Sequence, residues 1–263
     1  VPLIHHVHSP TTRDTESIWR NRKNAIIERL SVIGVAQLIP VSKSLESYLK
    51  KQGWSSTKIT MVANGVVTPG SLPDRPTPKS EWTIGSVALF RPRKGVEVLI
   101  QALSNLRQMG EVVRLRAVGP FETVEYEETI KEMAARLGVA DMIDWIGFAQ
   151  NVNAEFAKMD VLVLPSLFGE GMPMVILEAM AMGVPVVASD VEGIPEVLQH
   201  AHTGLVVPAG DAPQLASALF DLINNKYNWA AMRADAYSLQ VKSFSDHSMA
   251  AGVARVYNRI LAR

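Results

Sequence analysis

One segment constrains the fold of this chain more than any other. Two apolar runs, Val161–Leu164 and Val184–Ala188, flank a helix-forming stretch that opens with glycines and Pro173. Short apolar runs bounded by glycine and proline are typical of strands buried on both faces. Similar runs alternate with helical patterns from Thr83 onward, and strands that alternate with helices form parallel sheets covered by helices. The sequence therefore predicts a doubly wound α/β domain.

Two carboxylates bracket the start of the predicted helix. Glu170 lies before it and Glu178 about a turn inside it, with seven residues between them. Pro173 suits a first helical position, because its φ is preset and it has no N–H to leave unbonded. The free N–H groups and partial positive charge of a helix N-terminus suit a phosphate, so the two carboxylates could hold polyols on either side of it. This layout predicts a nucleotide-sugar site.

The structural alternative is a crossover helix that carries two incidental glutamates. Glu178 stands among Met, Val, Ile, Leu and Ala, and glutamate is rarely buried without a partner. The functional interpretation is therefore favoured.

An ordered set of motifs supports this interpretation: Val62–Gly65, Arg93–Val96, Asp160–Ser166, Glu170–Glu178, Leu177–Pro185, Gly193–Glu196 and Thr203–Asp211. In this order they resemble the retaining glycosyltransferases of family 4, and Glu170 with Glu178 resembles the E-x7-E motif of that family. The family has the GT-B fold, in which two Rossmann-like domains face each other across a cleft. The resemblance implies metal-independent transfer of a sugar from a UDP- or GDP-sugar to an acceptor hydroxyl, with the anomeric configuration kept, in polysaccharide or glycoconjugate biosynthesis.

The resemblance also implies roles for single residues. Glu178 would accept hydrogen bonds from the ribose hydroxyls, and Glu170 would meet hydroxyls of the donor sugar. His8, at the end of the first predicted strand, would face that sugar across the cleft. Residues that would line the phosphates, sugar or base, largely through their backbone, are Gly171, Met172, Pro173, Met174, Val175 and Phe148.

A basic loop after the first strand of the second domain would stabilise the leaving phosphate. Lys94 matches the lysine of the family. The arginine of the family lies five residues earlier, where this chain has Leu89. Arg91 is the favoured replacement and Arg93 the second choice, while a solvated basic loop is the alternative.

Composition narrows the function classes. Lys+Arg 26 balance Asp+Glu 26, so the net charge gives no reason to expect a nucleic-acid partner. The absence of Cys excludes disulfides and Cys-ligated metals. Asp190–Glu192 matches an Asp-x-Asp metal motif only weakly. His6 and His8 lie on one face of a strand and His5 on the other, without a carboxylate partner, so neither a metal nor a cofactor is expected.

No apolar run reaches membrane-spanning length, the first residues do not form a signal peptide, and a cytoplasmic location is expected. The basic stretch Trp19–Lys23, with Arg29, predicts either a solvated helix face or a peripheral contact with a membrane. The second would suit a lipid-linked acceptor, and a glycan acceptor is the other expectation.

Proline and glycine between residues 67 and 81 indicate a linker. The expected division is 1–66, the later part of an N-terminal acceptor-side Rossmann-like domain; 67–81, the linker; 82–243, the complete C-terminal nucleotide-sugar-binding domain; and 244–263, a helix crossing back to the first domain. Strands are expected at 3–8, 37–42, 58–63, 83–89, 113–119, 142–148, 161–166, 184–189 and 203–208, with helices at 16–33, 43–51 and 245–261.

Two Rossmann-like domains usually need about 300–400 residues, so the opening part of the first domain is expected to be missing or supplied by a partner chain. Two alternatives stay open. The chain could be a nucleotide-sugar-binding fragment, or half of a split enzyme, without activity alone. It could also be a GT-B nucleotide-sugar epimerase, because fold-level analogy does not separate epimerases from transferases.

Overall fold

The computed structural model describes residues 1–13, 17–78 and 81–262. Glu16, the predicted start of the first helix, lies outside the described residues, as do residues 79–80 of the predicted linker and Arg263.

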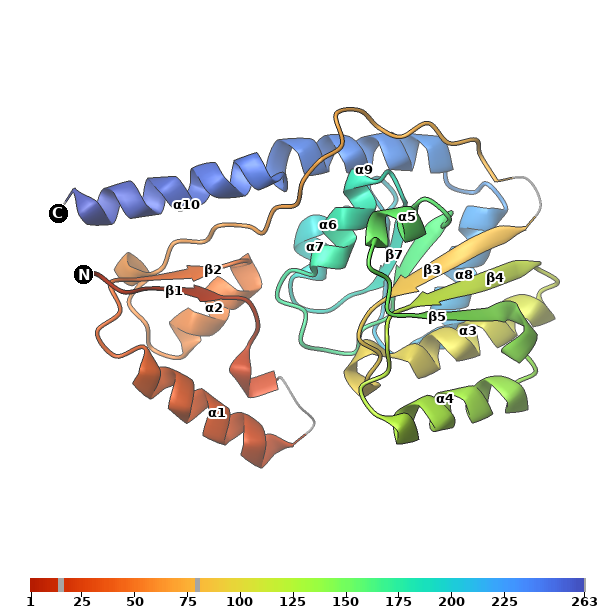
Figure 1. The fold of residues 1–263 in the computed structure, drawn as a ribbon, viewed down its shortest axis with the longest axis horizontal. Helices are drawn as coiled ribbons and strands as arrows, with labels where there is room; N and C mark the ends of the chain where they lie inside the picture. The colour runs from red at the N-terminus through yellow and green to blue at the C-terminus, as the bar shows by residue number, and fades with distance from the viewer. Residues whose placement is uncertain (14–16, 79–80, 263) are drawn as a thin grey trace.

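A six-stranded parallel sheet forms the larger part of the molecule (Figure 1). Its strands stand in the order β5-β4-β3-β6-β7-β8, and all neighbouring pairs are parallel. Their bounds are β3 (Trp82–Val87), β4 (Val113–Val118), β5 (Ile143–Gly147), β6 (Val161–Leu164), β7 (Val186–Ser189) and β8 (Leu205–Val207). Each overlaps a strand predicted from the sequence, so the predicted doubly wound α/β sheet is confirmed.

Side chains of this sheet alternate between two apolar layers. On β6, Val161 and Val163 face the layer that contains α3 (Val96–Gln108), α4 (Val124–Arg136) and α8 (Ala212–Ile223). Leu162 and Leu164 face the layer that contains α6 (Met174–Ala181) and part of α9 (Trp229–Ser243). Because successive strand residues point to opposite faces, a continuous apolar run is what a strand covered on both sides requires.

The N-terminal part forms a smaller sheet. Its strands β1 (Ile4–Val7) and β2 (Gln37–Pro40) are parallel, and they are followed by α1 (Ile18–Ser31) and α2 (Lys43–Lys51) respectively. The predicted strand at 58–63 is wrong as a strand, although its residues run beside β2. Thr60 and Val62 donate their N–H groups to Leu38 and Pro40 at 3.0 and 3.1 Å. The return bond of a parallel ladder would come from residue 40, and proline has no N–H to give.

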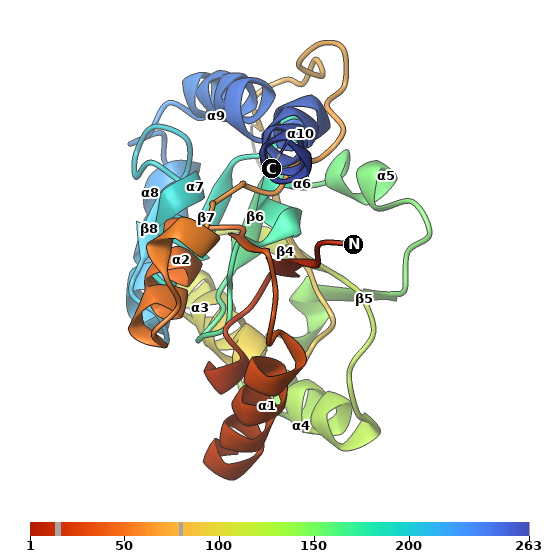
Figure 2. The ribbon, with the colours of Figure 1, turned by 90° about the vertical axis from the view of Figure 1, so that its left-hand side faces the viewer.

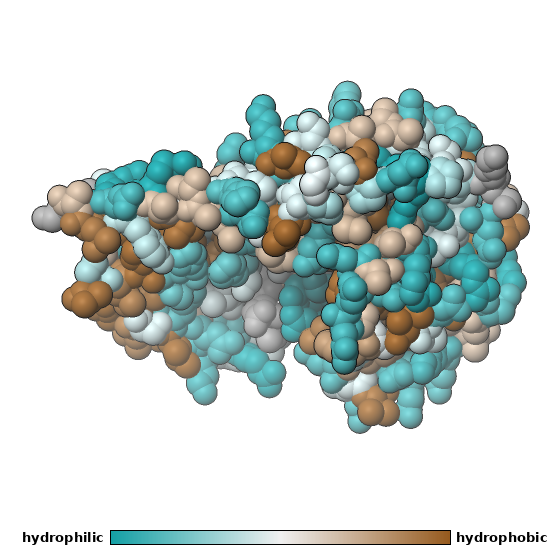
Figure 3. All heavy atoms as spheres, turned by 45° about the horizontal axis from the view of Figure 1, so that its top comes forward, coloured by the Kyte–Doolittle hydropathy of each residue, from teal (hydrophilic) through white to brown (hydrophobic). Residues whose placement is uncertain are grey.

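The apolar side of α1 lies open to solvent. The exposed fractions of Trp19, Ile26 and Leu30 are 80%, 62% and 61%, and Ile18, Ile27 and Ile33 are exposed as well. Figure 3 shows apolar surface gathered at the end of the molecule that, in Figure 1, carries β1 and β2. None of the described helices is long and apolar enough to cross a membrane.

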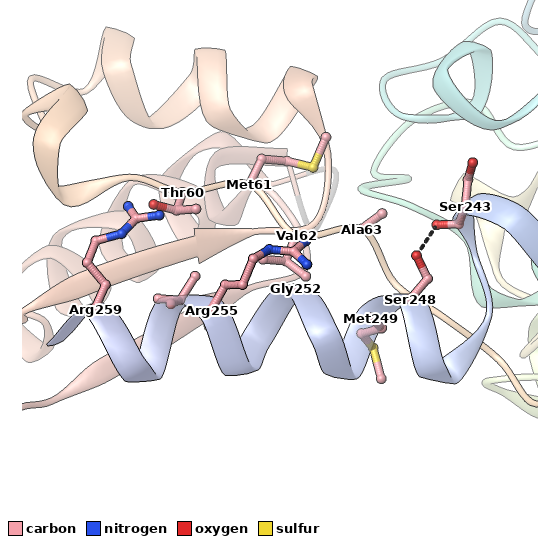
Figure 4. A pocket seen from close by; sticks show the side chains of 11 residues that line it. Thr60, Met61, Val62, Ala63, Ser243, Ser248, Met249, Gly252, Arg255 and Arg259 are labelled. Atoms are coloured by element: carbon pink, nitrogen blue, oxygen red, sulfur yellow. Dashed lines mark hydrogen bonds between the residues drawn. The ribbon is translucent and has the colours of Figure 1, made fainter. Parts of the chain in front are cut away.

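The last helix, α10 (Asp246–Leu261), runs from the larger part to the smaller one (Figures 1 and 2). Ser245 caps it by accepting the N–H of Ser248 at 3.2 Å. Close packing is possible at Gly252, where an added Cβ would lie 2.7 Å from Val62. Beside this contact Arg255 and Arg259 line a cavity of about 180 Å³ against residues 60–63 (Figure 4).

The described part of the predicted linker runs along α9. Tyr237 donates its hydroxyl to the carbonyl of Pro69 at 2.6 Å, and Thr68 donates to Gln240 at 2.8 Å. The buried Arg233 donates to the carbonyls of Pro73 and Gly183 at 2.7 and 2.6 Å. These bonds fix the segment to the larger part of the molecule.

Candidate functional site

The order of the strands determines where a site can form. β3 lies in the middle of the sheet, and the chain adds β4 and β5 on one side and β6, β7 and β8 on the other. Ligands of open α/β sheets bind at the carboxyl ends of the strands where this order reverses. Here those ends carry the loops that contain Lys94, after β3, and Glu170, after β6.

Glu170 is a buried carboxylate with several donors around one oxygen. It is 5% exposed, and its Oε1 accepts Lys94 Nζ at 2.5 Å and Ser166 Oγ at 2.6 Å. Arg93 Nη1 lies 3.7 Å from the same oxygen. A buried carboxylate requires such compensation, because leaving it unpaired would cost several kcal/mol, roughly 3 to 5.

Lys94 is the centre of the basic loop. Burial lowers the pKa of its ammonium below the ordinary value, and the charge and hydrogen bond of Glu170 offset only part of this effect. Lys94 and Arg93 both lie near the Glu170 carboxylate, Lys94 at 2.5 Å and Arg93 at 3.7 Å.

The structure separates the two candidate arginines. Arg93 donates to the carbonyls of Phe168 and Gly169 at 3.4 and 3.1 Å, so it lies against the loop that carries Glu170. Arg91 lies 3.5 Å from Glu122 instead. Sequence reasoning favoured Arg91, whereas the geometry brings Arg93 to Glu170.

Glu178 is in a different state. It is half-buried on α6, and burial raises the pKa of its carboxyl group. Within the described part of the chain its carboxylate has no hydrogen-bond or ion-pair partner. A carboxylate that is partly removed from water and not compensated is a candidate ligand group.

The N-terminus of α6 lies between the two carboxylates. Pro173 occupies the position just before the helix, one residue earlier than predicted, and the first turn begins at Met174. The N–H groups of Met174 and Val175 find no acceptor among the residues that the structure describes. Pro173 and Met172 are buried, and Asn64 donates to the Met172 carbonyl at 3.1 Å. Asn64 belongs to the Val62–Gly65 motif, and the sequence alone predicted no contact for its side chain.

Glycines allow three backbones to meet beside Glu170. A Cβ on Gly171 would lie 2.0 Å from the carbonyl oxygen of His8, and one on Gly193 would lie 1.8 Å from that of Gly171. The end of β1 is therefore in contact with the loop of Glu170. The imidazole of His8 is exposed and stacks on His6, with ring centroids 6.3 Å apart. Burial and the two neighbouring histidines lower the pKa of His6.

Phe148, a residue predicted to line the nucleotide-sugar site, lies just after β5 and is 78% exposed. Trp145, on β5 itself, packs on Phe90 and Phe121. No group of three or more metal-ligating side chains occurs among the described residues.

A cavity of about 340 Å³ lies on the β1 side, lined by residues that include Thr12, Tyr48 and Glu192.

Comparison with known proteins identifies the family. The family model described as glycosyl transferases group 1 matches residues 71–238, which is more than half of the chain. The chain belongs to this family. The phosphatidyl-myo-inositol mannosyltransferase of Mycobacterium leprae is 29% identical over 274 aligned positions, covering 98% of this chain and 67% of that protein. The amylovoran biosynthesis glycosyltransferase AmsK of Erwinia amylovora is 28% identical over 231 positions, covering 85% of this chain and 56% of that protein. The chain thus spans between about half and two thirds of the length of these relatives.

Solved structures agree on the fold. The crystal structure of Anabaena Alr3699/HepE in complex with UDP and glucose has a TM-score of 0.85 at 20% identity, and the match covers 98% of this chain and 71% of that chain. The chain therefore has the GT-B type of α/β fold.

Proposed function

We propose that this chain carries the donor site of a retaining glycosyltransferase that transfers a sugar from a UDP- or GDP-sugar to an acceptor hydroxyl without a metal. The observation that supports this most directly is the pair of carboxylates around the start of α6. Glu170 is compensated by Lys94, and Glu178 has no partner among the described residues. The complex of HepE with UDP and glucose, on a similar fold, is consistent with a nucleotide-sugar ligand.

In the proposed complex each part of the donor meets a different group. The ribose hydroxyls donate to Glu178, and the diphosphate lies at the N–H groups of Met174 and Val175. Lys94 and Arg93 stabilise the charge that develops on the leaving phosphate, a role that a metal has in other sites. Glu170 accepts hydroxyls of the donor sugar, and the exposed ring of Phe148 is available to the base.

The acceptor approaches from the β1 side. His8 directly follows β1 and lies next to the loop of Glu170, and residues of the neighbouring loop and α2 line the cavity of about 340 Å³. We propose a glycan or a lipid-linked acceptor. For the lipid-linked case, the exposed basic and apolar side chains of α1 would contact a membrane surface.

Calorimetric titration tests the donor site. The chain is titrated with UDP and with GDP in the presence of EDTA, beside Glu178→Ala and Lys94→Ala. We expect one nucleotide to bind with a micromolar to millimolar Kd, and binding to be lost in both variants. Binding that needs a divalent metal, or that survives in both variants of a folded chain, would overturn the proposal.

A second candidate function is nucleotide-sugar binding without catalysis by this chain alone. The sugar would then be transferred only when a further α/β segment completes the enzyme. Two observations favour it. In the described part of the chain β1 has β2 as its single strand neighbour, so one edge of the small sheet is open. The apolar side of α1 is exposed beside it. Donor hydrolysis or transfer by the chain alone would exclude this candidate, whereas nucleotide binding without either reaction would favour it.

A further inference from the structure

A carboxylate from the larger part of the molecule caps a helix of the smaller part. Glu196 belongs to α7 (Ile194–Val197), which follows β7. Its Oε2 accepts the N–H of Lys43 at 2.6 Å, and its Oε1 accepts the N–H of Ser44 at 2.7 Å. These are the first two N–H groups of α2, which have no partner within their own helix. Both bonds are charge-assisted, and the helix dipole favours the negative charge.

The helix has its own cap as well. Ser42 accepts the N–H of Leu45 at 3.2 Å, which is the ordinary N-cap bond. Glu196 therefore adds two bonds to a helix that is already capped. Glu196 differs from an ordinary cap in its distance along the sequence, because it lies 153 residues from Lys43 and 152 residues from Ser44.

The turn before Glu196 holds the backbone of Glu170. Gly193 donates its N–H to the carbonyl of Glu170 at 2.9 Å. The carboxylate of Glu192 accepts the N–H groups of Gly169 and Glu170 at 3.0 and 3.2 Å. Glu192 has a φ of +35°, a value that is rare outside glycine. Strained backbone of this kind persists only where the surrounding contacts enforce it.

These contacts form one continuous connection. It starts at the N-terminus of α2, passes through the Glu196 carboxylate and the turn at Glu192 and Gly193, and ends at Glu170. It adds to two other contacts between the two parts near this point, the close approach of Gly171 to the His8 carbonyl and the bond from Asn64 to the Met172 carbonyl. α2 begins at the carboxyl end of β2, directly beside β1 and His8.

We infer that Glu196 is a positioning residue, which by capping α2 fixes the distance between the β1–β2 sheet and the Glu170 loop and so sets the geometry of the donor-sugar site. The inference rests on the proposed function for the role of Glu170. The rival interpretation is that Glu196 contributes to stability alone. If Glu196 positions the site, its loss should weaken binding of the nucleotide-sugar more than binding of the nucleotide alone. If it contributes to stability alone, the ratio of the two dissociation constants should not change.

Two variants weaken the link from opposite sides. Glu196→Gln removes the charge and leaves one acceptor oxygen. Lys43→Pro removes one donor from the other side, and the change is compatible with α2, because proline suits the first position of a helix. Ser42 precedes it with φ −148° and ψ 161°, an extended conformation that residues before proline prefer.

Asp211→Asn is the matched control. Asp211 caps α8 by accepting the backbone N–H of Gln214 at 2.9 Å, and its other oxygen accepts the Gln214 side chain at 2.8 Å. The control therefore also loses a carboxylate at a helix N-terminus, but this helix packs within the larger part. It should lose a comparable amount of thermal stability without altering the donor site.

The first readout is the ratio of two dissociation constants. Kd is measured for UDP and UDP-glucose, and for GDP and GDP-mannose. We expect Glu196→Gln and Lys43→Pro to weaken the nucleotide-sugar about tenfold more than the nucleotide alone. Asp211→Asn should leave this ratio unchanged. An unchanged ratio in both test variants, or an equal change in the control, would overturn the inference.

The second readout does not depend on the ligand. The chain has no cysteine, so Lys51→Cys on α2 and Glu128→Cys on α4 give a unique pair of exposed spin-label sites. We expect the distance distribution to broaden in both test variants and not in the control. If wild type binds no nucleotide but the distribution broadens, the proposed function fails while the coupling stands. An unaltered distribution refutes the coupling even if the donor binds.

Discussion

Replacing Glu178 by glutamine should have opposite effects on stability and on nucleotide binding. The folded protein keeps this carboxylate half-buried and, among the described residues, without a partner. Glutamine keeps the shape and removes the charge, and a neutral amide loses less hydration free energy on burial than a carboxylate does. Because the side chain retains some contact with water, Glu178→Gln should raise the free energy of unfolding at pH 7 by only about 1 kcal/mol.

The sign of the pH dependence follows from the same residue. Burial raises the pKa of Glu178 in the folded state above its ordinary value near 4.5. The folded protein therefore holds this proton more tightly than the unfolded chain does. The resulting stability is fully present below the ordinary pKa and is lost as the pH rises through the folded pKa. The advantage of Glu178→Gln over wild type should thus appear near neutral pH and vanish around pH 4.

Nucleotide binding should change in the opposite direction. In the proposed complex Glu178 accepts the ribose hydroxyls, and bonds to a charged acceptor are roughly twice as strong as neutral ones. Loss of the charge should cost about 1.5–3 kcal/mol, which raises Kd roughly 10- to 100-fold.

The assay combines thermal unfolding at about pH 4 and pH 7 with calorimetric titration of the nucleotide. Glu128→Gln, on the exposed side of α4, is the control and should change neither quantity. A lower stability of Glu178→Gln at pH 7 would refute the claim that the carboxylate is uncompensated. An unchanged Kd, for a nucleotide that wild type binds, would refute its role at the ribose.

Further predictions concern the loop and the exposed helix. Lys94→Met should lower the free energy of unfolding by about 3 kcal/mol, because it removes the cation bonded to the buried Glu170 carboxylate and leaves the more distant Arg93, and adding Glu170→Gln should restore most of it in urea titrations. Gly193→Ala should lower the free energy of unfolding by more than about 3 kcal/mol, since its Cβ would lie 1.8 Å from the carbonyl oxygen of Gly171. A free energy of unfolding within about 1 kcal/mol of wild type, the size of an ordinary substitution effect, would contradict the contact. Leu30→Lys, at a site 61% exposed, should leave unfolding unchanged within about 0.5 kcal/mol and reduce binding of the dye ANS; a clear loss of stability would show that α1 is covered in solution.

The larger sheet could be predicted from the sequence because its strands are buried on both faces. Such strands are continuous apolar runs, and runs such as Val161–Leu164 stand out from the helical pattern around them. The prediction of a strand at 58–63 was wrong because of a residue outside that segment. Its partner strand ends in Pro40, which lacks the N–H that would complete the ladder. The sequence of 58–63 carries no trace of that partner.

The site could be predicted where its chemistry is local. Glu170, Glu178 and the α6 N-terminus lie within one short motif, and the structure brings Lys94 to 2.5 Å from Glu170. The choice between Arg91 and Arg93 depended on which way two neighbouring side chains point after β3. Sequence spacing does not contain that information.

Long-range backbone contacts were missed entirely. Glu196 was noted as part of a motif, yet its partners are N–H groups that every residue except proline possesses. Asn64 binds a carbonyl 108 residues away in the same manner. A side chain that recognises backbone places no requirement on the identity of its partner, so neither member of the pair can be read from the other.

The different states of the two carboxylates suggest how the proposed donor would enter. Lys94 is bound to Glu170 at 2.5 Å. A diphosphate at the start of α6 would draw the ammonium toward itself, because it carries more charge than one carboxylate. That shift would leave Glu170 Oε1, which already accepts the Ser166 hydroxyl, available to the incoming sugar. Glu178 needs no such exchange, because it has no described partner to give up. Nucleotide binding at Glu178 and α6 would therefore prepare Glu170 for the sugar, and a free nucleotide should weaken the Lys94–Glu170 pair even when no sugar is attached.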